Sequence, residues 1–69
     1  MNKTMTSEEP NVTSNGRYSI IETARALQVS KQTIYNYLLK GVLKCGVRRA
    51  NGTRFVMGSE ILRFWKSIL

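Results

Sequence analysis

Apolar residues recur with the period of an α-helix in two neighbouring stretches of the chain. The first stripe has the spacing i, i+4, i+7 and runs from Ile20 to Leu27. The second stripe is centred on Ile34 and ends near Lys40. The pattern predicts two short helices that share a small core formed by Ala24, Leu27, Val29, Ile34 and Leu38.

Capping residues mark the ends of both predicted helices. Ser19 and Glu22 have the spacing of a capping box, and Ser30 is suited to cap the second helix after a turn at residues 28–30. Gly41 can end that helix in the left-handed conformation. Two short helices joined by a tight turn are typical of a helix-turn-helix, whose second helix lies in the DNA major groove.

The second helix has a polar side suited to contact with DNA. A turn of 100° per residue places Ser30, Tyr37 and Leu38 on the buried side. Amide side chains bind adenine and lysine suits guanine or phosphate, but an ordinary solvated face is the alternative. Leu39 also falls in the outward arc, where it packs under the next segment, touches a thymine methyl or contacts a neighbouring copy. The other side chains expected to point outward are Gln32, Thr33, Tyr35, Asn36 and Lys40, together with Thr23 and Arg25 of the first helix.

Asn51-Gly52 is a strong signal for a two-residue β-hairpin turn, because a type I′ turn needs positive φ at both central positions. Cys45 then falls on the core side and is expected to be a small buried residue. Arg49 and Arg54 are then expected to lie opposite each other. Because like charges repel, this pairing favours a phosphate between them, with a solvated pair as the alternative. The predicted cross-strand pairs are Ala50 with Thr53, Arg49 with Arg54, Arg48 with Phe55 and Val47 with Val56.

The last segment predicts a strongly amphipathic helix that supplies much of the core. Ser59 is suited to cap it, and Glu60 suits the positive end of the helix dipole. A surface for a partner protein on this apolar face is the alternative. The apolar arc contains Ile61, Leu62, Phe64, Trp65, Ile68 and Leu69, and the opposite arc contains Arg63, Lys66 and Ser67.

Charge separates the chain into two parts. Residues 1–16 are rich in Asn, Thr, Ser and Glu and are expected to form a disordered tail, which leaves residues 17–69 as one domain with order beginning near Tyr18. The net charge is +7, and from Arg17 onward there are ten basic and two acidic residues. This excess favours a polyanion as partner, through phosphate contacts and counterion release, over a merely soluble basic surface.

The sequence contains few residues suited to metal binding or catalysis. The sequence has no histidine and a single cysteine, Cys45, so we expect no metal site and no cofactor. There are no paired carboxylates and no phosphate-binding glycine loop, and Glu22 and Glu60 have capping roles, so we expect neither an enzyme nor a small-molecule substrate. No apolar run approaches the roughly 20 residues that span a bilayer, and a cytoplasmic protein without a membrane partner is expected.

The order of helix, turn, helix, basic hairpin and helix resembles the winged helix-turn-helix of the excisionase family, which is related to the DNA-binding half of MerR-type regulators. The resemblance implies a mainly α fold with a small β-hairpin, in which the second helix enters the major groove and the hairpin, or wing, contacts the adjacent minor groove. Gln28 and Met57-Gly58 depart from the family pattern, which commonly has Gly and a Pro-basic pair there. The matching residues are Tyr18-Ser19-Ile20, Glu22, Ala24, the segment Val29 to Tyr35, Gly41 to Lys44, Gly52, Arg54 and Ser59-Glu60.

The resemblance implies a recombination directionality factor, which binds neighbouring DNA sites, bends the DNA and helps an integrase to excise a mobile element. The implied partners are double-stranded DNA, a tyrosine-type integrase and neighbouring copies of the protein, on bacterial or phage DNA. The alternatives are a small transcriptional regulator, a phage packaging module that recognises DNA, and an RNA-binding protein. The candidate DNA-binding residues are Ser30, Lys31, Gln32, Thr33, Tyr35, Asn36, Lys40, Arg48, Arg49, Asn51, Thr53 and Arg54.

Overall fold

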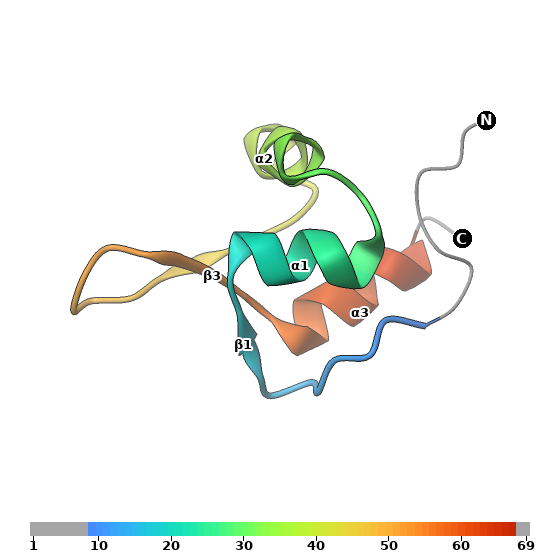
Figure 1. Cartoon of the computed structure of the whole chain (residues 1–69), viewed down its shortest axis with the longest axis horizontal. Helices are drawn as coiled ribbons and strands as arrows, with labels where there is room; N and C mark the ends of the chain where they lie inside the picture. The colour runs from blue at the N-terminus through green and yellow to red at the C-terminus, as the bar shows by residue number, and fades with distance from the viewer. Residues whose placement is uncertain (1–8, 68–69) are drawn as a thin grey trace.

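Three helices and a three-stranded antiparallel sheet form a mixed α/β fold in the computed structural model, which describes residues 9–67 (Figure 1). The sheet order is β1-β3-β2, so the third strand in sequence is central. The predicted helices and hairpin are present, but the prediction of a mainly α fold with one hairpin omits β1. The elements are β1 (Arg17–Tyr18), α1 (Ile20–Leu27), α2 (Lys31–Lys40), β2 (Gly46–Val47), β3 (Arg54–Met57) and α3 (Gly58–Ser67).

Both α1 and α2 begin and end where the sequence predicts. Ser19 Oγ accepts the N–H of Glu22 at 3.0 Å, and the Glu22 carboxylate accepts the N–H of Ser19 at 2.8 Å, which completes the capping box. Ser30 caps α2 through the N–H of Thr33, and Gly41 ends it with a φ of 76°. Caps of this kind typically contribute about 1 kcal/mol each, so local interactions define the limits of both helices.

The turn between α1 and α2 depends on a left-handed residue with a side chain. Gln28 has φ 57° and ψ 44°, and its N–H donates to the carbonyl of Arg25 at 3.2 Å. The N–H of Val29 donates to the carbonyl of Ala24 at 3.0 Å, so two carbonyls at the end of α1 find partners. The permissive turn geometry that Gln28 requires is therefore present.

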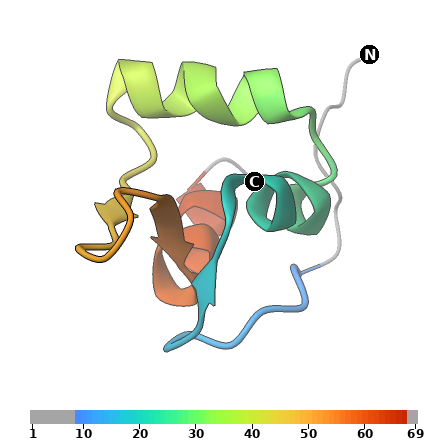
Figure 2. The ribbon, with the colours of Figure 1, turned by 60° about the vertical axis from the view of Figure 1, so that its left-hand side comes forward.

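One hydrophobic core lies where the three helices and β3 meet, with α2 lying across α1 (Figure 2). Leu43, in the loop after α2, is also fully buried. Val29 and Leu38, expected in the core, are half-buried against it. No helix within residues 9–67 is long and apolar enough to span a bilayer. The buried apolar residues are Ile20, Ala24, Leu27, Ile34, Leu43, Val56, Ile61, Phe64 and Trp65.

The amphipathic character predicted for the last helix is confirmed over α3. Ile61, Phe64 and Trp65 are buried in the domain's own core, whereas Arg63 and Lys66 are exposed. Trp65 is only 8% exposed, so it does not offer the partner surface considered as an alternative. Leu62 is half-buried, and the last two residues of that predicted face, Ile68 and Leu69, lie outside the described residues.

Three helix side chains, Thr23, Thr33 and Tyr35, do not face outward as predicted. Thr23 is fully buried, because its Oγ1 donates to the carbonyl of Ser19 at 2.8 Å and the hydroxyl is satisfied within α1. Tyr35 is half-buried and packs against the core, because the β2–β3 hairpin lies beside this face of α2. The outward positions that the sequence predicts correctly are Arg25, Gln32, Asn36, Leu39 and Lys40.

The β2–β3 hairpin has a register two residues away from the predicted one. Val47 pairs with Arg54 rather than with Val56. The N–H of Arg48 donates to the carbonyl of Thr53 at 2.9 Å, which is the last backbone bond before the loop. Four residues, rather than two, therefore lie between this bonded pair in the loop.

The conformation of the hairpin loop explains this difference. A type I′ turn requires positive φ at both central residues, but of the pair only Gly52 has one, at 70°. Asn51 instead uses its side-chain Oδ1 to accept the N–H of Thr53 at 3.0 Å. The N–H of Gly52 donates to the carbonyl of Arg48 at 2.8 Å, which closes a wider turn. Asn51 is part of the signal that predicts a two-residue turn, but the hydrogen bond of its side chain stabilises a different loop conformation.

The observed register overturns two predictions for the hairpin. Arg49 lies in the loop and does not face Arg54, so the predicted pair of opposed arginines with a phosphate between them is wrong. Cys45 is exposed rather than buried, and Val47 is 60% exposed. Both line an open hollow of about 410 Å³ between α2 and the hairpin, so α2 does not cover them. Leu43 fills the core in their place.

The segment before β1 contacts the domain. Pro10 is buried and Val12 packs against the core. The N–H of Thr13 donates to Tyr18 Oη at 2.7 Å. Contacts therefore begin by Pro10, earlier than the expected start of order, whereas residues 1–8 of the predicted tail lie outside the described residues.

The same segment supplies partners for the first amides of α3. The N–H of Gly58 donates to the carbonyl of Gly16, and the N–H of Ser59 donates to the carbonyl of Ser14, both at 2.8 Å. The helix begins at Gly58, so Ser59 lies in its first turn and is not the predicted N-cap. Backbone carbonyls take the place of the side-chain cap, because the segment passes directly over the start of the helix.

Candidate nucleic-acid interface

A row of exposed polar side chains runs along α2. Gln32, Asn36 and Lys40 are all exposed and follow one another at intervals of four residues, which spans about 12 Å at 1.5 Å per residue. Gln32 Nε2 donates to Asn36 Oδ1 at 3.3 Å. This bond orients the two amides and leaves the Gln32 carbonyl oxygen as an acceptor and both N–H groups of the Asn36 amide as donors. An acceptor and a donor side by side match the edge of adenine.

The first turn of α2 has less freedom to bind a ligand. Ser30 Oγ accepts the N–H of Thr33 at 3.1 Å, and the two hydroxyls are 2.8 Å apart and share a hydrogen bond. Ser30 is exposed, although the helical pattern places it on the buried side, and Thr33 is half-buried. Both candidate residues are thus engaged in capping, and of the residues at this end Lys31 is the exposed cation.

The start of α2 and the hairpin line one hollow. Lys31 of α2 and Thr53 and Arg54 of the hairpin border an open space of about 280 Å³. The start of α1 completes it through Ile21, a large apolar side chain that is 49% exposed. Candidate residues that are more than 20 positions apart in sequence are therefore brought to one place.

Tyr35 and Arg54 form the link between this hollow and the larger one farther along α2. Both residues line both spaces, so the two hollows adjoin each other along the side of α2 that faces the hairpin. We name this the helix–hairpin groove, lined by Lys31, Tyr35, Leu39, Val47, Thr53 and Arg54. It combines an aromatic and two aliphatic side chains with two cations.

The remaining hairpin candidates lie at or near the loop. Arg48, Arg49 and Asn51 are exposed. The Asn51 side chain is bound to the N–H of Thr53 and shapes the loop, so it is not free to read a base. Arg48 Cζ lies 5.7 Å from the ring centroid of Phe55, on the opposite side of the hairpin from α2. The structure does not bring Arg48 and Arg54 to one face.

Three residues around the hairpin are not among the DNA-binding candidates predicted from the sequence. Phe55, expected only as a strand residue, is half-buried on the outer face of the sheet, and Arg17 Cζ lies 5.1 Å from its ring centroid. Ile21 borders the helix–hairpin groove. The alternation of β3 could indicate that Phe55 faces away from Val56. No local sequence signal predicts β1, the strand that brings Arg17 beside Phe55.

The acidic side chains do not offset this basic surface. Glu22 is engaged in the capping box of α1, and Glu60 binds Arg63 on α3. Among the residues that the structure describes, this Arg63–Glu60 contact is the only ion pair. The cations of α2 and the hairpin are consequently left without carboxylate partners there.

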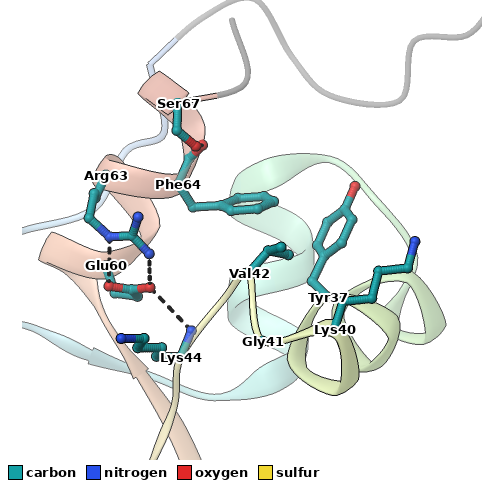
Figure 3. A pocket seen from close by; sticks show the side chains of 9 residues that line it. All are labelled: Tyr37, Lys40, Gly41, Val42, Lys44, Glu60, Arg63, Phe64 and Ser67. Carbon is teal, nitrogen blue, oxygen red and sulfur yellow. Dashed lines mark hydrogen bonds and ion pairs between the residues drawn. The ribbon is translucent and has the colours of Figure 1, made fainter.

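A second cleft, of about 610 Å³, lies between the end of α2, the following loop and α3 (Figure 3). The side chains of Val42 and Phe64 point into it, and the Phe64 ring packs against Tyr37 with centroids 4.8 Å apart. Lys40 and Arg63 are among the cations at its edge. The cleft lies at the other end of α2 from Lys31, about 13 Å away along the helix.

Glu60 stabilises this cleft from one side. Its carboxylate accepts hydrogen bonds from the Arg63 guanidinium and from the backbone N–H of Lys44, the latter at 3.1 Å. The hydrogen bonds from Arg63 and then Lys44, with the positive charges of both, outweigh partial burial and lower the pKa of Glu60 below its usual 4.5. The same pairing raises the pKa of Arg63. The carboxylate is therefore ionised and occupied at neutral pH, and is not poised for proton transfer.

Comparison of the chain with protein-family models, with curated proteins and with solved structures gives no match.

Proposed function

We propose that the protein binds double-stranded DNA, with α1 and α2 acting as a helix-turn-helix and the β2–β3 hairpin as a wing. The observation that carries the proposal is the helix–hairpin groove, which joins Lys31 at the start of α2 to Arg54 of the hairpin. Beside it, the amide side chains of Gln32 and Asn36 on α2 are exposed. Cations on two elements and a polar helix between them suit phosphate contacts on either side of a base-reading helix.

The exposed row of α2 supports a role in reading bases. Gln32 and Asn36 hold each other through one hydrogen bond, so little side-chain entropy is lost when they meet a base pair. Lys40, one turn farther on, reaches guanine or phosphate. A helix of this width fits the major groove of B-DNA, which is about 12 Å wide.

The aromatic side chains favour duplex DNA over single-stranded RNA. RNA-binding sheets commonly present open aromatic faces on which bases stack. Here Tyr37 packs against Phe64, and the Phe55 ring lies beneath two arginines. None of these three rings offers an open stacking surface.

Within DNA binding, we propose an excisionase, or recombination directionality factor, as the biological role. The support is the resemblance of the motif order to that family together with the small size of the interface. One domain with few base-reading side chains gains specificity when several copies fill adjacent sites. A small transcriptional regulator with the same domain is the alternative.

Binding to duplex DNA can be tested with the purified protein at several salt concentrations. Lys31→Ala should weaken binding to every sequence and reduce the salt dependence by about one phosphate contact. Lys66→Ala, an exposed lysine on α3, removes the same charge away from the groove and should leave both quantities unchanged. Equal effects of the two variants would indicate a general charge effect and contradict the assigned groove.

Footprinting and bending assays on the DNA around the gene separate the two roles. Several adjacent sites filled cooperatively, with strong bending beside an integrase attachment site, would support the excisionase. A single or palindromic site over a promoter, with little bending, would favour the regulator. Absence of protection at moderate salt would contradict DNA binding altogether.

A further inference from the structure

Phe55 supports two guanidinium groups on the outer face of the sheet. It projects from the central strand β3, and its cross-strand partner is Gly46. Arg17 Cζ lies 5.1 Å from its ring centroid and Arg48 Cζ 5.7 Å. The two arginines come from the two flanking sides of the sheet, one from β1 and one from the residue that follows β2.

Glycine at position 46 makes this arrangement possible. A Cβ there would lie 2.5 Å from Phe55 Cζ, so any side chain would displace the ring. With glycine, the Phe55 ring occupies the space that a side chain at position 46 would fill. Diagonal neighbours across a sheet are within reach of long side chains, which accounts for the approach of both arginines.

The two cations have no negative partner in the described part of the chain. The ion pair recorded there joins Arg63 and Glu60 on α3, away from this face. Each guanidinium gains from the negative face of the ring, but the two like charges repel each other. Both Arg17 and Arg48 are also exposed, so their remaining N–H groups point to solvent or to a ligand.

We propose that Arg17, Arg48 and Phe55 form a site for the phosphodiester backbone of DNA, with Phe55 as the positioning residue. Guanidinium groups held in place by an aromatic ring lose little freedom when they bind phosphate oxygens. The site lies outside the helix–hairpin groove and includes Arg17, which the groove does not contain. It rests on the proposed DNA binding and extends it to the opposite side of the hairpin.

The geometry of the hairpin accounts for two separate phosphate contacts. Arg54 shares a face with Val47 toward α2, whereas Phe55 and Gly46 share the opposite face. The minor groove is about 6 Å wide and has a phosphate strand along each edge. A two-stranded ribbon at this groove therefore meets one strand with Arg54 and the other with the outer site.

The test is the salt dependence of duplex binding for Arg17→Ala, with Lys66→Ala as the charge-matched control. Loss of one phosphate contact should make the drop in affinity between 50 and 200 mM salt about 3- to 4-fold smaller. The control should behave as the wild type. Phe55→Leu keeps the charge and an apolar side chain, and should lower affinity by a few-fold because the arginines lose their support.

A second measurement separates failure of this site from failure of DNA binding. Inorganic phosphate is added to the free protein at low salt, and NMR follows the Phe55 ring and the Arg17 guanidinium; signals of Arg17→Ala should not move. Duplex binding by the wild type with an unchanged salt slope in Arg17→Ala would overturn the outer site and leave the proposed function intact. No duplex binding and no phosphate-induced shift would overturn both. No duplex binding with a saturable shift would keep an anion site and reject DNA as its ligand.

Discussion

Glu60 accepts the backbone N–H of Lys44 at 3.1 Å and so joins α3 to the loop that follows α2. The two residues are 16 positions apart, and within residues 9–67 no backbone hydrogen bond joins the loop after α2 to α3. The same carboxylate binds Arg63 one turn along α3. One ionised side chain therefore holds the wall of the cleft between α2 and α3, next to the buried Leu43.

Replacing Glu60 by Gln should lower the free energy of unfolding at pH 7 by about 1 kcal/mol, because a charged acceptor becomes neutral. The folded-state pKa of Glu60 lies below 4.5, so its contribution is complete above that pH and is lost as the pH falls through the lowered value. Urea denaturation at pH 7 and pH 3 should show a larger wild-type advantage at pH 7 than at pH 3. Glu9→Gln, at an exposed position, is the control and should show no difference at either pH.

Gln28→Gly should stabilise the protein. Gln28 is the residue with a side chain that adopts the left-handed conformation within residues 9–67, and relief of that conformation is worth roughly 1 kcal/mol. Ala26→Gly, inside α1, is the matched control and should destabilise by about the same amount. Thermal melting of both variants gives the comparison, and a loss of stability in Gln28→Gly would mean that its side chain makes an unrecognised contribution.

Local signals predict most of this fold. Ser19, Glu22, Ser30 and Gly41 act within a few residues of themselves, so the sequence is sufficient to locate both helices. The apolar stripe of α3 is equally local, and Trp65 lies in the core as its position predicts. Capping is predicted correctly for α1 and α2, whereas at α3 the carbonyls of the distant segment before β1 replace the predicted cap of Ser59.

Distant contacts account for what the sequence does not predict. Strand β1 exists only because Arg17 and Tyr18 meet Met57 and Val56, almost 40 residues later. The hairpin register depends on whether Asn51 uses its backbone or its side chain in the turn, a choice that the Asn-Gly signal does not contain. The same reason applies to the candidate site. The exposed residues of α2 are predicted well, whereas the residues on the outer face of the sheet are not predicted.

Cys45 should react rapidly with thiol reagents in the folded protein. It is exposed and lines the open hollow between α2 and the hairpin. Reaction with a chromogenic disulfide should proceed at a rate within a few-fold of that in denaturant. Protection of the thiol by orders of magnitude would indicate that the hairpin closes onto α2 and would contradict the observed register.

Gly58→Ala should destabilise the protein by more than the usual cost of a surface change. A Cβ at this position would lie 1.7 Å from the carbonyl oxygen of Thr13, which is backbone and cannot rotate away. The segment before β1 must then leave the start of α3, which removes the two partners of its first amides. We expect a loss of about 2 kcal/mol. Gly41→Ala, where a Cβ meets no atom, is the control and reports only the strain of a positive φ.

Leu39 should contact a thymine methyl group. It is 85% exposed, so it does not pack under the hairpin, and it lies three residues after Asn36 on the same side of α2. Leu39→Ser should leave the stability within 0.5 kcal/mol of the wild type, as expected for an exposed position. It should lower affinity for a preferred site by about 4-fold, the equivalent of one apolar group of about 0.8 kcal/mol.

Deoxyuridine substitution distinguishes this contact from one between neighbouring copies. Uracil lacks only the methyl group of thymine, so replacing the contacted thymine should weaken the wild type by the same factor and leave Leu39→Ser unaffected. The measurement uses a duplex with a single site, where neighbouring copies are absent. If no thymine in the site shows this dependence, while Leu39→Ser reduces cooperativity on a duplex with two sites, the side chain contacts another copy and the thymine assignment is wrong.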